Sequence, residues 1–180
     1  MEIKAVTEAD LKELQAISTT TFIDAFGSVN TPEDMDAYVN ESRSLESLKK
    51  QLNADSEFYF LEADDQTIGY LKINYGLSQT EPHLTNCLEV QQIYIIKEYQ
   101  NKGLGKLLLD KAIQRGLNKG LGYIWLGVWE YNTDAIRFYE RLGFTPFGQH
   151  SFILGSDHQT DILMKKPLEQ PKDEPISQKL

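Results

Sequence analysis

The stretch from Gln100 to Lys106 (QNKGLGK) has the composition of a turn that binds an anion. It follows a run of β-forming residues that is too apolar for an exposed edge strand, and it precedes a segment whose apolar residues recur at helical spacing. The first backbone N–H groups of a helix have no partners inside it, and the helix dipole places about half a positive charge there. Gly103 and Gly105 carry no Cβ, so a phosphate can approach the backbone closely. These features predict a phosphate-binding turn between a buried strand and a helix.

Two better-known phosphate motifs do not match this turn. A dinucleotide-binding fingerprint requires a third glycine three residues after Gly105, where the chain has Leu108. A P-loop requires Ser or Thr after its Gly-Lys pair, and here Leu107 follows Lys106. The pattern that remains, Gln-x-x-Gly-x-Gly after an aliphatic strand, is short, so a glycine-rich connection without a ligand stays an alternative interpretation.

A second group of residues suited to chemistry lies downstream, beyond another predicted strand. The segment from Leu126 to Phe144 contains Asn132, then Phe138-Tyr139, then a Gly-Phe pair. Taken alone, Asn132 is typical of a helix N-cap, and Phe138 and Tyr139 are typical of packing residues on a helix. The order of the two groups is more informative than either group by itself.

Both motifs, in this order, resemble the hallmarks of the GNAT superfamily of acyl-CoA-dependent N-acetyltransferases, and the resemblance covers roughly residues 2–166. It implies acetyl-CoA as cosubstrate, with backbone groups of Ile93, Tyr94 and Ile95 on the pantetheine arm. It implies that Asn132 contacts the cosubstrate and that Tyr139 contacts it and protonates the departing thiolate. The pyrophosphate would be bound by the residues of the turn, namely Gln100, Asn101, Lys102, Gly103, Leu104, Gly105 and Lys106.

Within the superfamily, the chain is most similar to the PaiA-type polyamine N-acetyltransferases. The stretches that carry this similarity are Thr21-Phe22, Leu88-Glu89, Ile93-Tyr94-Ile95, Ile124 to Glu130 and Gln159-Thr160-Asp161. The resemblance implies that the acceptor is an amine of a polyamine such as spermidine or spermine. No activated Ser or Cys is visible, so we expect direct attack in a ternary complex, with the oxyanion held by backbone N–H groups near Ile93 and Ile95.

An amine acceptor requires a base. A polyamine nitrogen has a lysine-like pKa near 10.4, so deprotonation at pH 7 costs roughly 4–5 kcal/mol. Glu89 is our candidate base, because regular strand alternation would put Glu89, Gln91, Ile93 and Ile95 on one face. The PaiA-type relatives resemble this strand but have a second acid at the position of Gln91. Because Gln91 cannot be a base, we expect it only to contact the substrate. The alternative interpretation of Glu89 is a charge at a strand edge.

Charge is distributed unevenly along the chain. Residues 1–65 contain 15 acidic and 5 basic residues, whereas residues 66–180 contain 12 acidic and 13 basic residues. The net charge of −9 argues against a nucleic-acid partner. Acidic residues in the first part suit a polycationic acceptor, and we expect Asp24, Glu33 and Asp36 to bind it. An acidic half that only faces solvent is the alternative. A predicted basic strip along the turn and its helix suits anionic CoA and consists of Lys97, Lys102, Lys106, Lys111, Arg115 and Lys119.

The remaining features predict a cytoplasmic protein. No apolar run approaches the ~20 residues that span a bilayer, the N-terminus has no signal-peptide pattern, and Cys87 is the only cysteine. His83, His150 and His158 are too scattered in the sequence to indicate a catalytic triad or a metal site. We therefore expect no metal and interpret the three histidines as surface or packing residues.

The order of predicted elements is β-α-α-β-β-β-α-β-α-β-β, with the second helix starting at Thr31 and extending to about Leu52. Together with the resemblance, it predicts an α/β GNAT fold: a mixed, mostly antiparallel sheet with a splayed central strand pair and helices on both faces. We expect one acetyltransferase domain over residues 1–166 and a flexible tail over residues 167–180. The final hairpin is predicted at 150–154 and 160–165.

Three functions fit the sequence. The one we favour is acetyl transfer from acetyl-CoA to a polyamine amine. An acidic acceptor side is also compatible with acetylation of a protein N-terminus or lysine. A regulatory protein that senses acetyl-CoA or polyamine without turnover is the third, although it would not need Tyr139 and Glu89. The sequence leaves open whether the protein is a monomer or a homodimer.

Overall fold

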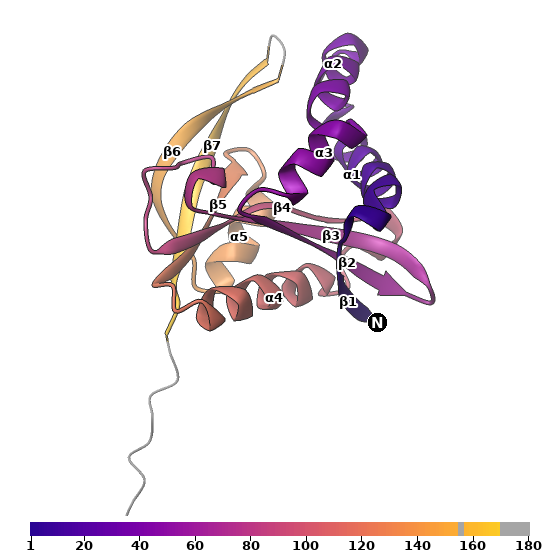
Figure 1. The fold of residues 1–180 in the computed structure, drawn as a ribbon. Coiled ribbons are helices and arrows are strands. Elements are labelled where there is room, and N and C mark those ends of the chain that lie inside the picture. Colours follow the sequence, from indigo (N-terminus) through magenta and orange to yellow (C-terminus); the bar gives the residue numbers. More distant parts are fainter. Residues whose placement is uncertain (155–156, 170–180) are drawn as a thin grey trace, which may run out of the picture.

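The computed structural model describes residues 1–154 and 157–169. In this part of the chain, one mixed sheet has the strand order β1-β2-β3-β4-β5-β7-β6, and α-helices cover both of its faces (Figure 1). The strands are β1 (Glu2–Ala5), β2 (Ser56–Ala63), β3 (Gln66–Tyr75), β4 (Cys87–Ile95), β5 (Tyr123–Trp129), β6 (Thr145–Leu154) and β7 (Asp157–Pro167). The α-helices are α1 (Leu11–Phe26), α2 (Pro32–Ser42), α3 (Leu45–Leu52), α4 (Leu104–Asn118) and α5 (Thr133–Arg141). None of the described helices has the length and apolar character needed to cross a membrane.

The centre of the sheet is the parallel pair of β4 and β5, which α4 connects. All other neighbouring strands are antiparallel. The parallel pair is short: it contains Cys87 with Tyr123, Leu88 with Ile124, and Glu89 with Trp125. Beyond Glu89 the two strands separate, so the backbone edge of β4 that faces β5 is not part of a described strand pair. The predicted fold class, including the splayed central pair, is confirmed.

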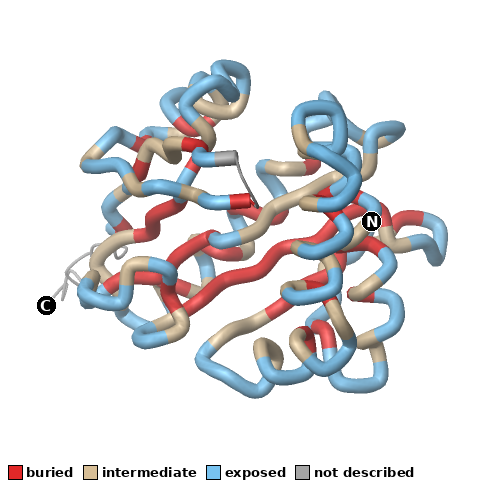
Figure 2. Tube along the Cα trace, turned by 90° about the horizontal axis from the view of Figure 1, so that it is seen from above, coloured by how far each residue is buried: buried red, intermediate tan, exposed pale blue. Residues whose placement is uncertain are grey.

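Two apolar cores lie on opposite faces of this sheet. The core under α4 and α5 includes Leu71, Val90 and Leu108, and the core under α1 and α3 includes Leu14, Phe60 and Tyr70. A burial-coloured trace shows the middle strands almost continuously buried (Figure 2). Such two-sided burial explains why the sequence of β4 is too apolar for an exposed edge strand. We refer to the two sides as the α1/α3 face and the α4/α5 face.

A β-bulge interrupts β4. Ile73 of β3 pairs with Val90, but Lys72 pairs with Gln92, so Gln91 is an extra residue on β4. Directly opposed residues share a face, and the bulge therefore shifts the alternation of every residue after it. Glu89 lies on the α1/α3 face, whereas Ile93 and Ile95 pack against the core under α4 and α5. The expectation that Glu89, Ile93 and Ile95 share one face is wrong, because it assumed regular alternation.

The predicted second helix is two helices. Thr31 caps α2 by accepting a hydrogen bond from Asp34 N at 3.2 Å, and Ser44 caps α3 in the same way from Ser47 N at 3.2 Å. Ser44 cannot cap α3 and also continue α2, because an N-cap residue has non-helical backbone angles. The chain therefore turns between α2 and α3. Arg43, at this turn, is buried and its Nε donates to the carbonyl of Ser18 at 3.1 Å.

The C-terminal boundary also lies beyond the predicted one. Pro167 ends β7, and the buried Leu168 donates its backbone N–H to Gly122 O at 2.9 Å and belongs to the core under α4 and α5. The closing hairpin, β6 and β7, is longer than predicted. Of the tail predicted for 167–180, residues 170–180 lie outside the described part of the chain.

Candidate active site

The predicted phosphate turn forms the connection between β4 and α4. Gly103 is the N-cap of this 15-residue helix and has left-handed backbone angles, φ 76° and ψ 5°. A Cβ added there would meet none of the described atoms within 4 Å, so the backbone borders open space. Asn101 also has a positive φ, 60°, a conformation that Asn tolerates better than most residues. A helix N-terminus with an unobstructed glycine before it has the geometry for binding a phosphate.

Side chains of the turn bind the turn itself. The amide of Gln100 donates to the carbonyl of Ile95 at 2.8 Å, and the ammonium of Lys102 donates to the carbonyl of Glu98 at 3.0 Å. Lys106 pairs with Asp110 at 2.6 Å on the exposed side of α4. The turn therefore presents mainly backbone to the space outside Gly103, and Gln100 fixes its shape.

The two glycines have different environments. A Cβ at Gly105 would lie 3.9 Å from Cζ of Phe138, on α5, which is an ordinary contact. Gly105 therefore lies where α4 meets α5, and only Gly103 borders open space. From the sequence, both glycines were expected to let a phosphate approach the backbone.

Half of the predicted basic strip lies elsewhere. Arg115 forms two hydrogen bonds of 2.8 Å with the carboxylate of Glu57, on β2. Lys111 and Lys119 lie over the rings of Tyr59 and Tyr75, at 4.9 and 4.4 Å from their centroids. These three cations pack against the sheet and do not line the turn, because helical periodicity directs them toward β2 and β3. Lys97, Lys102 and Lys106 are the members of the strip that belong to the turn and the first turn of α4.

Tyr139, the predicted acid, lies on the α4/α5 face. Its ring packs between Phe138 and Phe144, with centroid distances of 5.2 and 5.6 Å. Burial raises the pKa of Tyr139 to about 12, so its hydroxyl keeps its proton at neutral pH and can donate it. Asn132 accepts a hydrogen bond from Ala135 N at 3.2 Å and is the N-cap of α5, as the simpler interpretation expected.

Glu89, the predicted base, is buried at the point where β4 and β5 separate. Its side chain accepts hydrogen bonds from Asn74 Nδ2 at 3.0 Å, Thr80 N at 2.9 Å and Thr80 Oγ1 at 2.5 Å. Asn74 also donates to Gln91 Oε1 at 3.1 Å. The alternative that Glu89 is a strand-edge charge is wrong, since β4 is a central strand and Glu89 is only 3% exposed.

A second buried charge lies near Glu89 on the same face. Lys72 is 5% exposed, and its Nζ donates to Gln51 Oε1 at 2.7 Å. Burial lowers the pKa of Lys72 to about 8, while Glu89 acts in the opposite direction. Lys72 was not among the predicted site residues, because a lysine in an apolar strand gives no local sign of its burial.

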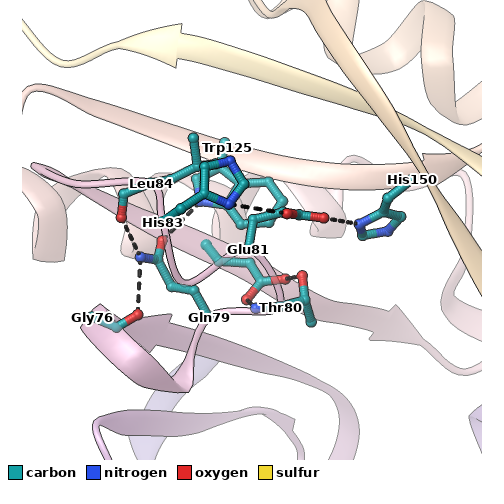
Figure 3. Close-up of polar contacts among 9 residues, drawn as sticks. Gly76, Gln79, Thr80, Glu81, His83, Leu84, Trp125 and His150 are labelled. Carbon is teal, nitrogen blue, oxygen red and sulfur yellow. Dashed lines mark hydrogen bonds and ion pairs between the residues drawn. The ribbon is translucent and has the colours of Figure 1, made fainter.

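The loop between β3 and β4 holds the site together, a role that the sequence analysis missed. Gln79 is buried, and its Oε1 accepts from Trp125 Nε1 at 2.8 Å, while its Nε2 donates to the carbonyls of Gly76 and Leu84, both at 3.2 Å. Figure 3 shows how Gln79, Thr80 and Glu81 reach in different directions from this loop. Consecutive residues therefore bind β5, β4 and β6 in turn.

The loop also brings histidines together that looked scattered in the sequence. Glu81 contacts His150 Nδ1 at 2.8 Å and His83 Nδ1 at 3.4 Å (Figure 3). On the other side of the ring, Asp161 lies 3.5 Å from His150 Nε2. The hydrogen bond to Asp161 raises the pKa of His150 against the opposing effect of burial, and Glu81 adds to the rise. His83 is exposed and His150 is partly buried, as expected of surface and packing residues, but both contact the same carboxylate. His158 is exposed on β7.

Gly127 leaves the sheet uncovered next to this cluster. It is exposed although its neighbours Leu126 and Val128 are buried and β5 is a central strand. A Cβ at Gly127 would lie 3.4 Å from both Asp161 Oδ2 and His150 Nε2. The partly buried carboxylate of Asp161 therefore borders an open part of the α1/α3 face.

The acids predicted to bind the acceptor have other surroundings. Asp24 forms an ion pair of 3.2 Å with Lys97, which ties α1 to the turn. Glu33 and Asp36 are exposed on α2, and Glu33 lies in the first helical turn, where the dipole favours an acid. The structure brings Glu89 and Gln91 together with Asn74, but it does not bring these three acids into that group.

Comparisons with known proteins agree with this geometry. Residues 16–144 match the acetyltransferase (GNAT) family. An uncharacterized N-acetyltransferase of Lactobacillus delbrueckii subsp. lactis is 42% identical over 169 residues, covering 93% of this chain and 98% of the relative. A spermidine N(1)-acetyltransferase of Thermoplasma acidophilum is 26% identical over 149 residues, covering 80% and 88%. Among solved structures, PaiA N-acetyltransferase from Thermoplasma acidophilum in complex with coenzyme A superposes with a TM-score of 0.73 at 25% identity, covering 93% and 99%.

These matches identify the class of reaction as well as the fold. The protein is an N-acetyltransferase with acetyl-CoA as cosubstrate, and PaiA is among its relatives. The open turn at Gly103 and the separated β4 and β5 fit such a cosubstrate. The resemblance inferred from the sequence is confirmed, and the chain belongs to the GNAT family of acetyltransferases.

Proposed function

We propose that the protein transfers the acetyl group of acetyl-CoA to an amine of a polyamine such as spermidine or spermine. The observation that carries this proposal is the position of two proton-transfer groups on opposite faces of the sheet where β4 and β5 separate. Glu89 lies on the α1/α3 face, and Tyr139 lies in the core of the α4/α5 face. An amine that enters from one face and a thiol that leaves on the other would each meet the group it needs.

The turn and the edge of β4 would bind the cosubstrate. Gly103 and the N-terminus of α4 would hold its pyrophosphate through backbone N–H groups, and the unpaired edge of β4 at Ile93 to Ile95 would hold its pantetheine arm. The cap residue Asn132 would contact the cosubstrate from α5. Tyr139, which burial keeps protonated at neutral pH, would give its proton to sulfur as the thiolate departs.

A cationic acceptor is supported by acidic groups on the α1/α3 face. Asp161 borders the uncovered sheet at Gly127, and Glu81 lies on the other side of His150. Two relatives are named for polyamines: the spermidine acetyltransferase above and a probable spermine N(1)-acetyltransferase of Bacillus subtilis subsp. natto, 29% identical over 126 residues. The exposed Glu33 and Asp36, with Asp24 and Gln91, remain candidates for more distant amines.

The test is release of thiol from acetyl-CoA with a panel of acceptors. Spermidine, spermine, putrescine and a lysine-rich peptide are compared at low salt, and products are identified by mass. We expect turnover with the polyamines at higher kcat/KM than with the peptide. If kcat/KM for the peptide far exceeds that for spermine, the acceptor is a protein amine and the enzyme class is unchanged. Binding of both ligands without turnover would support a sensor.

A further inference from the structure

Glu89 is poorly placed to take a proton directly from an acceptor amine. Its side chain is buried, and both carboxylate oxygens already accept hydrogen bonds from Asn74 or Thr80. Because Glu89 is only 3% exposed, an ammonium group has little access to the carboxylate beside these donors. A base with this geometry needs an intermediary that is reachable from outside.

Thr80 is exposed, yet it contacts this buried carboxylate through two groups. Its Oγ1 donates to Glu89 Oε1 at 2.5 Å, the shortest of the three contacts, and its backbone N–H donates to Oε2 at 2.9 Å. A hydroxyl has one proton and two lone pairs. Because its proton points to Glu89, the lone pairs of Thr80 are available to a donor from the acceptor side.

The position of Thr80 is fixed by its neighbours in the chain. Gln79 anchors the loop to Trp125 at 2.8 Å, and Glu81 anchors it to His150 at 2.8 Å (Figure 3). A residue held from both sides keeps its hydroxyl over Glu89 without ordering cost during the reaction. Trp125 is also the β5 partner of Glu89 in the last pair before the two strands separate, so Thr80 lies at the start of the gap.

We propose that Thr80 is a catalytic proton relay between the acceptor amine and Glu89, an inference that rests on the proposed function. A proton of the acceptor ammonium passes to Oγ1 of Thr80 while the hydroxyl proton of Thr80 passes to Oε1 of Glu89, which leaves a neutral amine. The amine nitrogen forms a bond to the acetyl carbon and loses its second proton to solvent. The carbon–sulfur bond breaks, and sulfur takes the proton of Tyr139. Solvent then removes the proton from Glu89 and returns one to Tyr139, so the cycle balances.

Three variants test the relay. Thr80→Val removes the hydroxyl but keeps the shape and the backbone N–H, and we expect kcat to fall roughly 10²-fold, within the range of general acid–base catalysis, with the KM for acetyl-CoA unchanged. Thr80→Ser should restore kcat to within about threefold of the wild type. Thr85→Val, at an exposed threonine of the same loop, is the matched control and should behave as the wild type.

Two further readouts separate a relay from a structural role. The solvent isotope effect on kcat in mixtures of H₂O and D₂O should indicate two protons in motion for the wild type and fewer for Thr80→Val. Glu89→Gln combined with Thr80→Val should be no slower than Glu89→Gln alone, since both act on one step.

An unchanged kcat in Thr80→Val, or failure of Thr80→Ser to recover, would overturn the relay. Additive losses in the double variant would also overturn it. A wild-type protein that acetylates neither polyamine nor peptide would instead refute the proposed function, which is a distinguishable result. Thermal unfolding of each variant verifies that it is folded.

Discussion

The two halves of the site are built in different ways. The part of the proposed cosubstrate site that would bind pyrophosphate and pantetheine is one continuous segment, from Ile93 to Lys106, and α5 adds Asn132 and Tyr139. The segment would bind through backbone groups, while side chains of its turn contact the turn itself. The proposed acceptor half would be assembled from side chains of β3, the β3–β4 loop, β4, β6 and β7.

This difference has a consequence for substitutions. A backbone site depends on φ and ψ, so most side-chain changes in the turn should matter little and a change at its left-handed glycine should matter more. A side-chain site loses its geometry when one partner is removed, because buried polar groups are then left unpaired.

Replacing Glu89 with Gln should have the largest effect. We expect kcat for spermidine to fall roughly 10³-fold at pH 6.5, because the base is lost while nearly all acceptor is protonated. The loss should shrink toward pH 9, where more amine is neutral. The pH dependence of kcat measures this, and thermal unfolding detects any destabilisation from an amide placed among donors. A uniform loss at all pH values would contradict a role in deprotonation.

Replacing Tyr139 with Phe should act on the other proton. The ring keeps its packing against Phe138 and Phe144, so the protein should remain stable, and kcat should fall about 10²-fold with little change in the affinity for acetyl-CoA. Steady-state kinetics and calorimetry with acetyl-CoA separate the two quantities. If kcat stays at the wild-type value, the proton comes from water or another group.

Changes at Gly103 test the backbone half. Gly103→Glu places a carboxylate beside the expected phosphate at a left-handed position, and we expect the Kd for acetyl-CoA to rise about 30-fold. Gly103→Asn tolerates the same backbone angles without charge, so its Kd should rise less than about threefold. Calorimetry compares the two. Equal affinities of the Glu variant and the wild type would place the phosphate elsewhere.

His150 should have the smallest effect, on stability. Its pKa is raised in the folded state above the unfolded value near 6.5, so its stabilising contribution is fully present below that value and is lost as pH rises through the folded pKa. His150→Gln should therefore cost more stability at about pH 6 than at pH 9, measured by urea unfolding. The groups facing His150 are Glu81 and Asp161, with His83 beyond Glu81. His158→Gln, at an exposed position, is the control and should show no such difference.

Much of the fold was predictable from local patterns. The turn at Gly103 was placed correctly between β4 and α4. The break between α2 and α3 was missed because apolar residues continue at helical spacing across Ser44. A single serine N-cap is a weaker sequence signal than this continuous apolar periodicity. Boundaries near Pro167 were set by packing of Leu168, which composition does not reveal.

Local sequence patterns were sufficient to predict the strand, turn and helix of the proposed cosubstrate half, because apolar periodicity and glycine act within a few residues. The pairing of β4 with β3 creates the bulge at Gln91, and this bulge places Glu89 on the opposite face of the sheet from Ile93 and Ile95. Only the tertiary structure shows this arrangement. It also decided the surroundings of Glu81, which meets His150 from 69 positions away in the chain. Side-chain contacts over such separations depend on how the whole sheet closes, and no local pattern encodes them.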